Sequence, residues 1–153
     1  MRQLLRVVVV LSLLATAIVL AQAAAPAAPK PPGMDEMQVV ILKDVKWTPA
    51  KPPLPSGVSV SPIAADPAPG GSIGYAKYTP GLEFPMHWHS ATEYTTVLSG
   101  TVRYTVEGKT TEMGPGSYIV IPAKAKHSVV CLPASECIAM TRRAGPTDYN
   151  WVK

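Results

Sequence analysis

From residue 38 onward, the chain consists of short runs of β-branched, aromatic and other apolar residues separated by glycine and proline. Val102, Tyr104 and Val106 alternate with the polar residues Arg103 and Thr105, which is the period-two pattern of a half-buried strand. After the N-terminal apolar run, no stretch keeps apolar residues at helical spacing without a proline interrupting it. Strands are predicted at residues 38–42, 58–64, 72–79, 82–89, 93–99, 101–107, 109–113, 117–121, 127–132 and 136–142. Ten short strands predict an all-β domain, either a sandwich or a small barrel.

The N-terminal segment has a different pattern. Residues 7–21 form an uninterrupted apolar run of 15 residues, with two arginines before it and Ala21-Gln22-Ala23 at its end. This is the pattern of a secretory signal peptide with its cleavage site. A membrane anchor is the alternative, but 15 residues that rise ~1.5 Å each are too short for a ~30 Å hydrocarbon core.

The chain is therefore expected to have three parts. Residues 1–23 are a cleaved signal peptide, residues 24–37 a linker rich in proline and alanine, and residues 38–153 the folded domain. We expect the mature protein to be exported, either periplasmic or secreted, and to have no stable membrane anchor.

Composition narrows the function classes further. Charged residues make up only 16% of the 153 residues, and the formal net charge of +4 includes two arginines of the expected signal peptide. Because no basic stripe remains in the domain, nucleic-acid binding has no electrostatic support. The expected partner is a small-molecule ligand or substrate.

All three histidines of the chain lie in two short segments. His87 and His89 are two residues apart, so on a strand both imidazoles point to the same face, and Glu93 follows after a short turn. His127 begins a later predicted strand. A lone histidine is usually a hydrogen-bonded core or surface residue. Three imidazoles and one carboxylate, with an H-x-H pair among them, instead predict a divalent metal site.

The same two segments carry a resemblance to a known family. The first matches the first cupin motif, G-x5-H-x-H-x3-E-x6-G, at every fixed position; these are Gly81, His87, His89, Glu93 and Gly100. The second is similar to the second cupin motif, G-x5-P-x-G-x2-H-x3-N; it matches at Gly116, Pro122 and His127, and departs at Lys124 and Cys131. Lys124 stands where the family usually has glycine, so the motif does not predict the conformation of the turn before His127.

The resemblance implies a jelly-roll domain, that is, a double-stranded β-helix barrel. It implies His87, His89, Glu93 and His127 as ligands of one divalent ion, and the ligand set does not choose among Fe, Mn, Zn, Ni and Cu. No other cofactor is expected, and no further catalytic residue is identified. Because such domains expose edge strands, a homodimer is a further hypothesis.

Cys131 and Cys137 are separated by five residues that read as a turn between two strands. In an oxidising compartment they are disulfide candidates. The alternatives are a pair of small buried apolar side chains with inert thiols and, less favoured, a catalytic thiol.

A few other residues have two interpretations each. Tyr104 is expected to pack between strands, although its hydroxyl could face the metal site. Lys124 and Lys126 could attract an anionic substrate, but two exposed lysines in a turn are ordinary. The segment 145–151 is expected to anchor the C-terminal tail on the domain or on a partner subunit.

Two function hypotheses follow. The first is a metal-dependent oxidoreductase of dioxygenase type, or a lyase, acting on a small oxygenated molecule. The second is a non-catalytic cupin that binds or senses a metal or small ligand. Fold alone does not choose between them, because cupins support many unrelated functions.

Overall fold

The computed structural model describes residues 37–153. The expected signal peptide, and the linker up to residue 36, lie outside these residues. In the described part no helix is long and apolar enough to cross a membrane. Apart from one short 3₁₀ helix, η1 (Leu42–Asp44), the regular structure is all strand, as the sequence predicts.

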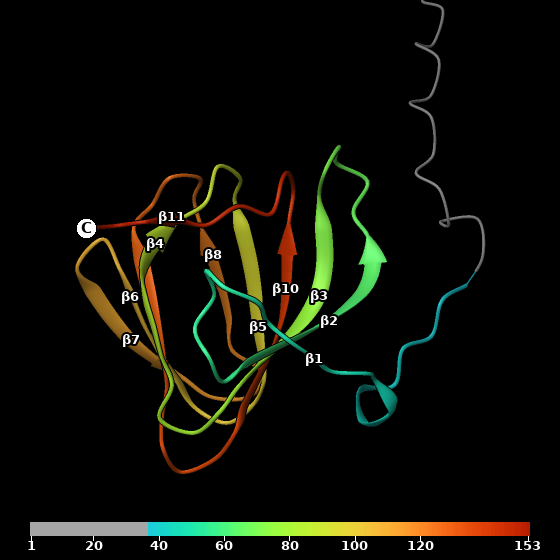
Figure 1. Cartoon of the computed structure of the whole chain (residues 1–153), viewed down its shortest axis with the longest axis horizontal. Coiled ribbons are helices and arrows are strands. Elements are labelled where there is room, and N and C mark those ends of the chain that lie inside the picture. The colour runs from blue at the N-terminus through green and yellow to red at the C-terminus, as the bar shows by residue number, and fades with distance from the viewer. Residues whose placement is uncertain (1–36) are drawn as a thin grey trace, which may run out of the picture.

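Two antiparallel sheets make up the domain (Figure 1). The six-stranded sheet has the order β1-β2-β3-β10-β5-β8. Its strands are β1 (Thr48–Pro49), β2 (Val58–Ala65), β3 (Ser72–Tyr78), β10 (Cys137–Arg143), β5 (Glu93–Ser99) and β8 (Tyr118–Ile121). The five-stranded sheet has the order β11-β4-β9-β6-β7. Its strands are β11 (Asn150–Trp151), β4 (Glu83–Trp88), β9 (His127–Cys131), β6 (Val102–Val106) and β7 (Lys109–Met113).

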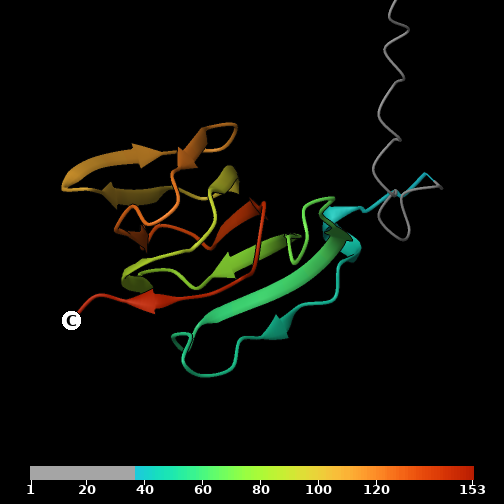
Figure 2. The same ribbon diagram turned by 90° about the horizontal axis from the view of Figure 1, so that it is seen from above.

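The core lies between the two sheets, which face each other in Figure 2. Val97 and Cys137 of the six-stranded sheet and Phe84, Val102 and Val129 of the five-stranded sheet belong to one buried cluster. No strand pairing joins the sheets within residues 37–153, so the closed barrel expected from the sequence is wrong in that detail. The jelly-roll prediction is confirmed, but side-chain packing rather than a continuous ladder holds the sheets together.

The strand predicted at residues 38–42 is also wrong. Val39 is 70% exposed and Ile41 is 54% exposed, and no neighbouring strand pairs with them in the described chain. A β-branched run forms a strand only where a partner strand and a buried face are available. Two short strands that the pattern did not predict, β1 and β11, form because β2 and β4 offer them free edges.

Two motif positions set turns near the site. Gly100 has a φ of 73°, and a Cβ atom there would lie 2.5 Å from the carbonyl oxygen of Glu136, so only glycine fits. Lys124, at the position where the motif usually has glycine, keeps the left-handed conformation with a φ of 66°. Its backbone N–H donates to the carbonyl of His89 at 2.8 Å, which ties the turn before His127 to the other histidine segment.

Candidate metal centre

The three histidines come together because β4 and β9 are neighbours. His87 on β4 is paired in register with His127 on β9, and His89 follows directly after the end of β4. All three side chains are buried, with exposures of 2–3%. Their ring centroids are 4.2 Å (His87 to His127), 4.8 Å (His87 to His89) and 5.1 Å (His89 to His127) apart, and one nitrogen of each lies within 4.8 Å of the others.

Backbone carbonyls fix the orientation of each ring. Nδ1 of His87 donates to the carbonyl of Pro85 at 2.7 Å, and Nδ1 of His127 donates to that of Ala125 at 2.9 Å. Nδ1 of His89 donates to the carbonyl of Asp148. A carbonyl only accepts, so each Nδ1 carries a hydrogen and each ring presents its Nε2 as the atom available to a ligand. This is the tautomer that ligates a metal through Nε2.

Nε2 of His127 is buried and has no hydrogen-bond partner among the described residues. Buried polar atoms are rarely left without a partner, and a metal ion or a water molecule is the usual partner when no protein atom is near. The free Nε2 of His127 therefore fits a metal ligand. Burial, together with the nearby His127, lowers the pKa of His87 to about 4. Burial also lowers the pKa of His127. Both rings are therefore neutral at pH 7, as metal ligation requires.

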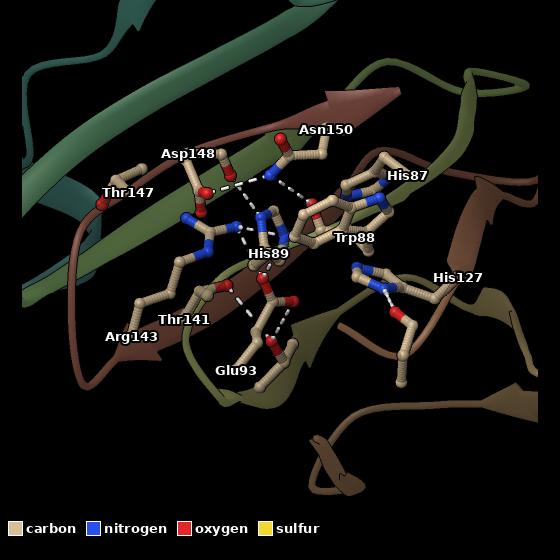
Figure 3. Close-up of polar contacts among 12 residues, drawn as sticks. His87, Trp88, His89, Glu93, His127, Thr141, Arg143, Thr147, Asp148 and Asn150 are labelled. Carbon is tan, nitrogen blue, oxygen red and sulfur yellow. Dashed lines mark hydrogen bonds and ion pairs between the residues drawn. The ribbon is translucent and has the colours of Figure 1, made fainter. Parts of the chain in front are cut away.

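Glu93 lies beside the histidines but is held by an arginine (Figure 3). One carboxylate oxygen is 2.6 Å from Nη2 of Arg143 and 3.1 Å from Nε2 of His89, and the other accepts from the hydroxyl of Thr95 at 3.1 Å. Burial opposes ionisation, but Arg143 and His89 hold the pKa of Glu93 well below its usual range. The structure thus brings all four predicted residues together, while the group whose ligand atoms converge within 4.8 Å contains the three histidines without Glu93.

Arg143 is one of two site residues that sequence reasoning missed; the other, Asp148, is described with the tail below. Its side chain is 13% exposed, its guanidinium lies 5.1 Å from the ring centroid of Tyr149, and it contacts Glu93 at the centre of the site. A signal was present in the sequence: Cys137 and Ala139 are buried on β10, and Arg143 has the same strand parity. Alternation therefore indicated that Arg143 faces inward.

The C-terminal tail runs from the end of β10 to β11, which pairs with β4 beside His87 (Figure 1). The carboxylate of Asp148 accepts from the backbone N–H of Ser90 at 3.0 Å, from the Ser90 hydroxyl at 2.5 Å and from Asn150 at 2.9 Å. Tyr149 packs 5.0 Å from the ring of His89. The tail thus docks on its own domain, the first of the two predicted alternatives.

Two cavities adjoin at this point. A small one of about 20 Å³ contains His87, Glu93, Tyr104 and His127 in its wall, so Tyr104 faces the site as well as packing in the core. A second cavity of about 280 Å³ lies between β2, β3, β10 and the tail. The two cavities share four wall residues, namely Tyr78, Phe84, Arg143 and Tyr149.

The two cysteines form a disulfide between the ends of β9 and β10, with both residues buried. Lys124 and Lys126 are exposed in the turn before His127, and neither lines a cavity described above.

The family comparison agrees with this geometry. Residues 74–140 match the family model described as a Cupin domain, and that range contains all four predicted ligands. This part of the chain belongs to the cupin family. No curated protein is significantly similar to the sequence of this cupin.

Solved structures support the same fold. The polyketide cyclase RemF from Streptomyces resistomycificus superimposes with a TM-score of 0.65 at 24% identity, over 77% of this chain and 87% of that one. A cupin-like protein from Thermotoga maritima gives a TM-score of 0.61 at 18% identity, over 69% and 84%. KdgF from Halomonas sp. gives 0.57 at 20% identity, over 68% and 90%. At these identities the likeness establishes the fold alone.

Proposed function

We propose that this cupin is a metal-dependent enzyme that acts on a small oxygenated molecule, as an oxidoreductase or a lyase. One divalent ion would be held by His87, His89 and His127, with Glu93 as a fourth donor. The observation that carries the proposal is the unpartnered, buried Nε2 of His127 beside two further imidazoles whose Nδ1 atoms also bond backbone carbonyls. The cyclase among the structural neighbours is consistent with small-molecule chemistry in this fold.

The chemistry of the site is divided among its parts. A bound divalent ion supplies Lewis acidity, which polarises an oxygen atom of the substrate. The carbonyls of Pro85, Ala125 and Asp148 keep the three rings oriented for it. The Tyr104 hydroxyl stays protonated because burial raises its pKa well above its usual value, so it serves as a hydrogen-bonding group rather than a base.

The binding-only function is the second candidate, and one observation favours it. Arg143 neutralises Glu93, so the carboxylate nearest the histidines is not a free general base. Oxygen uptake by the metal-loaded protein, measured with candidate substrates, identifies an oxidoreductase, and product formation without oxygen uptake identifies a lyase. Ligand binding without either result identifies a binding protein.

The three histidines of the site are the only ones in the chain, so no other imidazole competes for a metal ion in an untagged protein. Metal content therefore tests the site directly. The protein is purified without a histidine tag and its metal content is measured. We expect about one ion per wild-type chain and almost none in His127→Ala. The neighbouring variant Lys126→Ala, at an exposed side chain, is the matched control and should match the wild type. Metal-free wild-type protein, or full occupancy in His127→Ala, would contradict the proposal.

We also propose that the chain is exported after cleavage near Ala23. The apolar run at residues 7–21 supports this, and a buried disulfide suits an oxidising compartment. Mass spectrometry of the exported protein checks it, and an intact Met1 in the membrane fraction would contradict it. A homodimer is a separate proposal, supported by the outer edge of β8, which has no partner strand within residues 37–153 and carries the 58% exposed Tyr118. Sedimentation analysis decides it.

A further inference from the structure

The larger cavity and Arg143 together indicate the chemistry of the ligand. We propose that the 280 Å³ cavity binds a small, largely apolar carboxylate, whose charged group pairs with Arg143 at the boundary with the histidine site. This proposal rests on the function proposed above in that it names the class of ligand that the same site binds.

The cavity has the size and lining for an apolar body. Its wall includes Val60, Ile73 and Ala76, and exposed Pro62 and Thr147 form part of its rim. A dry cavity of roughly 150 Å³ already accepts benzene, so 280 Å³ accommodates one ring with substituents. Burying that ring against apolar walls provides the non-directional part of the affinity.

Arg143 supplies the directional part. Among the described residues that line the cavity, it alone carries a charge. Its Nη2 contacts Glu93, whereas its Nε is buried without a hydrogen-bond partner within residues 37–153. A buried guanidinium with an unused Nε–H donor is suited to a carboxylate, which it can bind through a charge-assisted hydrogen bond.

The charge of the cavity wall favours an anion over a neutral ligand. Arg143 is the one charged residue among the described residues that line the larger cavity, and its buried Nε has no hydrogen-bond partner there. A phosphate fits less well, because the larger cavity offers one cation and mostly apolar surface.

The test compares benzoate with benzamide, which has almost the same shape but no charge. Both are titrated calorimetrically into the metal-loaded full-length protein and into a chelator-treated sample, and the metal content of each sample is measured. We expect benzoate to bind at least about tenfold more tightly than benzamide, the effect of a charge-assisted hydrogen bond. Equal affinities, or no binding of benzoate, would overturn the proposal.

Variants locate the site of binding. Ile73→Trp places a large ring in the cavity away from the histidines and should abolish benzoate binding while metal content stays at the wild-type level. Val120→Trp adds the same ring at a 47% exposed position on β8 and should bind benzoate as the wild type does. Arg143→Met should remove the preference for benzoate, and Arg143→Lys should retain part of it. Unchanged benzoate affinity in a folded Ile73→Trp protein would overturn the proposed cavity.

The two proposals fail separately. Wild-type protein that contains no metal but prefers benzoate would contradict the metal centre and leave the carboxylate site standing. Protein that contains metal but shows no preference would contradict the carboxylate site alone.

Discussion

At the scale of single residues, Lys124 shows how the backbone can retain a motif turn after the motif residue has changed. The left-handed conformation costs an ordinary L-residue about 1–2 kcal/mol. Here the turn is kept by the hydrogen bond from Lys124 N–H to the carbonyl of His89 and by that from Ala125 N–H to the carbonyl of Pro122. These two hydrogen bonds offset the strain of the left-handed conformation at Lys124, and the turn that they hold places His127 beside His89.

Lys124→Gly should therefore stabilise the fold. Glycine removes the clash of the Cβ atom but costs about 0.5–1 kcal/mol in unfolded-state entropy, so the expected net gain is roughly 0.5–1 kcal/mol. The matched control is Lys126→Gly, because Lys126 has no positive φ to relieve. Glycine there adds only the entropy of the unfolded chain, so this variant should lose about 0.5–1 kcal/mol of stability. Urea unfolding of the three proteins measures both changes. A loss of stability in Lys124→Gly would contradict the strain argument.

His87 should make the metal-free protein sensitive to mild acid. Burial, together with the nearby His127, lowers its pKa in the folded state to about 4, whereas an unfolded histidine titrates near 6.5. Between these values the unfolded chain binds the extra proton, so stability falls as the pH falls. We expect His87 to account for about 2 kcal/mol of lost stability between pH 7 and pH 5.

The measurement is urea unfolding with chelator present at both pH values, for the wild type and for His87→Gln. The variant should show a smaller loss between pH 7 and pH 5. An equal loss in both proteins would assign the acid sensitivity to other groups.

At the scale of elements, the sequence predicted the strands that carry motif residues correctly. It was less reliable for short strands at the edge of a sheet, which form only where a neighbouring strand is free to pair. The resemblance to the two cupin motifs implied that β4 and β9 contribute to one site, and in the structure His87 is paired in register with His127. The run at 38–42 had the right residue types but no partner edge. Propensity is local, whereas pairing depends on which edges the rest of the fold leaves free.

Arg143 and Asp148 were missed as site residues for the same reason. Each reaches the site through contacts that span more than 40 residues of sequence, Arg143 with Glu93 and Asp148 with His89 and Ser90. No local spacing rule encodes such pairs. Strand parity could have shown that Arg143 faces inward, but not that Glu93 would be its partner.

The docked tail should raise the metal affinity through His89. The Asp148 carbonyl accepts from His89 Nδ1, and the Asp148 side chain holds this backbone in place through Ser90 and Asn150. Asp148→Ala should loosen the tail and weaken metal binding about 10-fold, the lower end of the effect of losing an orienting partner. Chelator competition measures this, with Asp44→Ala at an exposed aspartate as the control. Unchanged affinity would mean that the tail is not needed to orient His89.

At the scale of the whole molecule, the candidate metal centre lies where the two sheets meet. His87 and His127 belong to the five-stranded sheet, while Glu93 and Arg143 belong to β5 and β10 of the six-stranded sheet. Within the described chain no strand pairing connects the sheets, so they are joined through packed side chains and through contacts such as that between His89 and Glu93. An ion bound to residues of both sheets would add a connection between them.

A divalent ion should therefore stabilise the entire domain in one cooperative transition. An ion present at one hundred times its dissociation constant adds about 2.7 kcal/mol to the free energy of unfolding, so chelation should lower the melting temperature of the wild type. His127→Ala should lose this dependence on metal, because the remaining donors do not complete the ligand set.

Glu93→Gln tests what the six-stranded sheet contributes to metal binding. The substitution keeps the shape of the side chain but removes the negative charge that this sheet supplies to the site. If Glu93 is the fourth ligand, this variant should bind metal more weakly and gain less stability from it than the wild type. Calorimetric melting of the three proteins, with metal and with chelator, measures these differences. An identical metal-dependent shift in Glu93→Gln and wild type would leave the ion on the three histidines alone, with Glu93 serving only as the partner of Arg143.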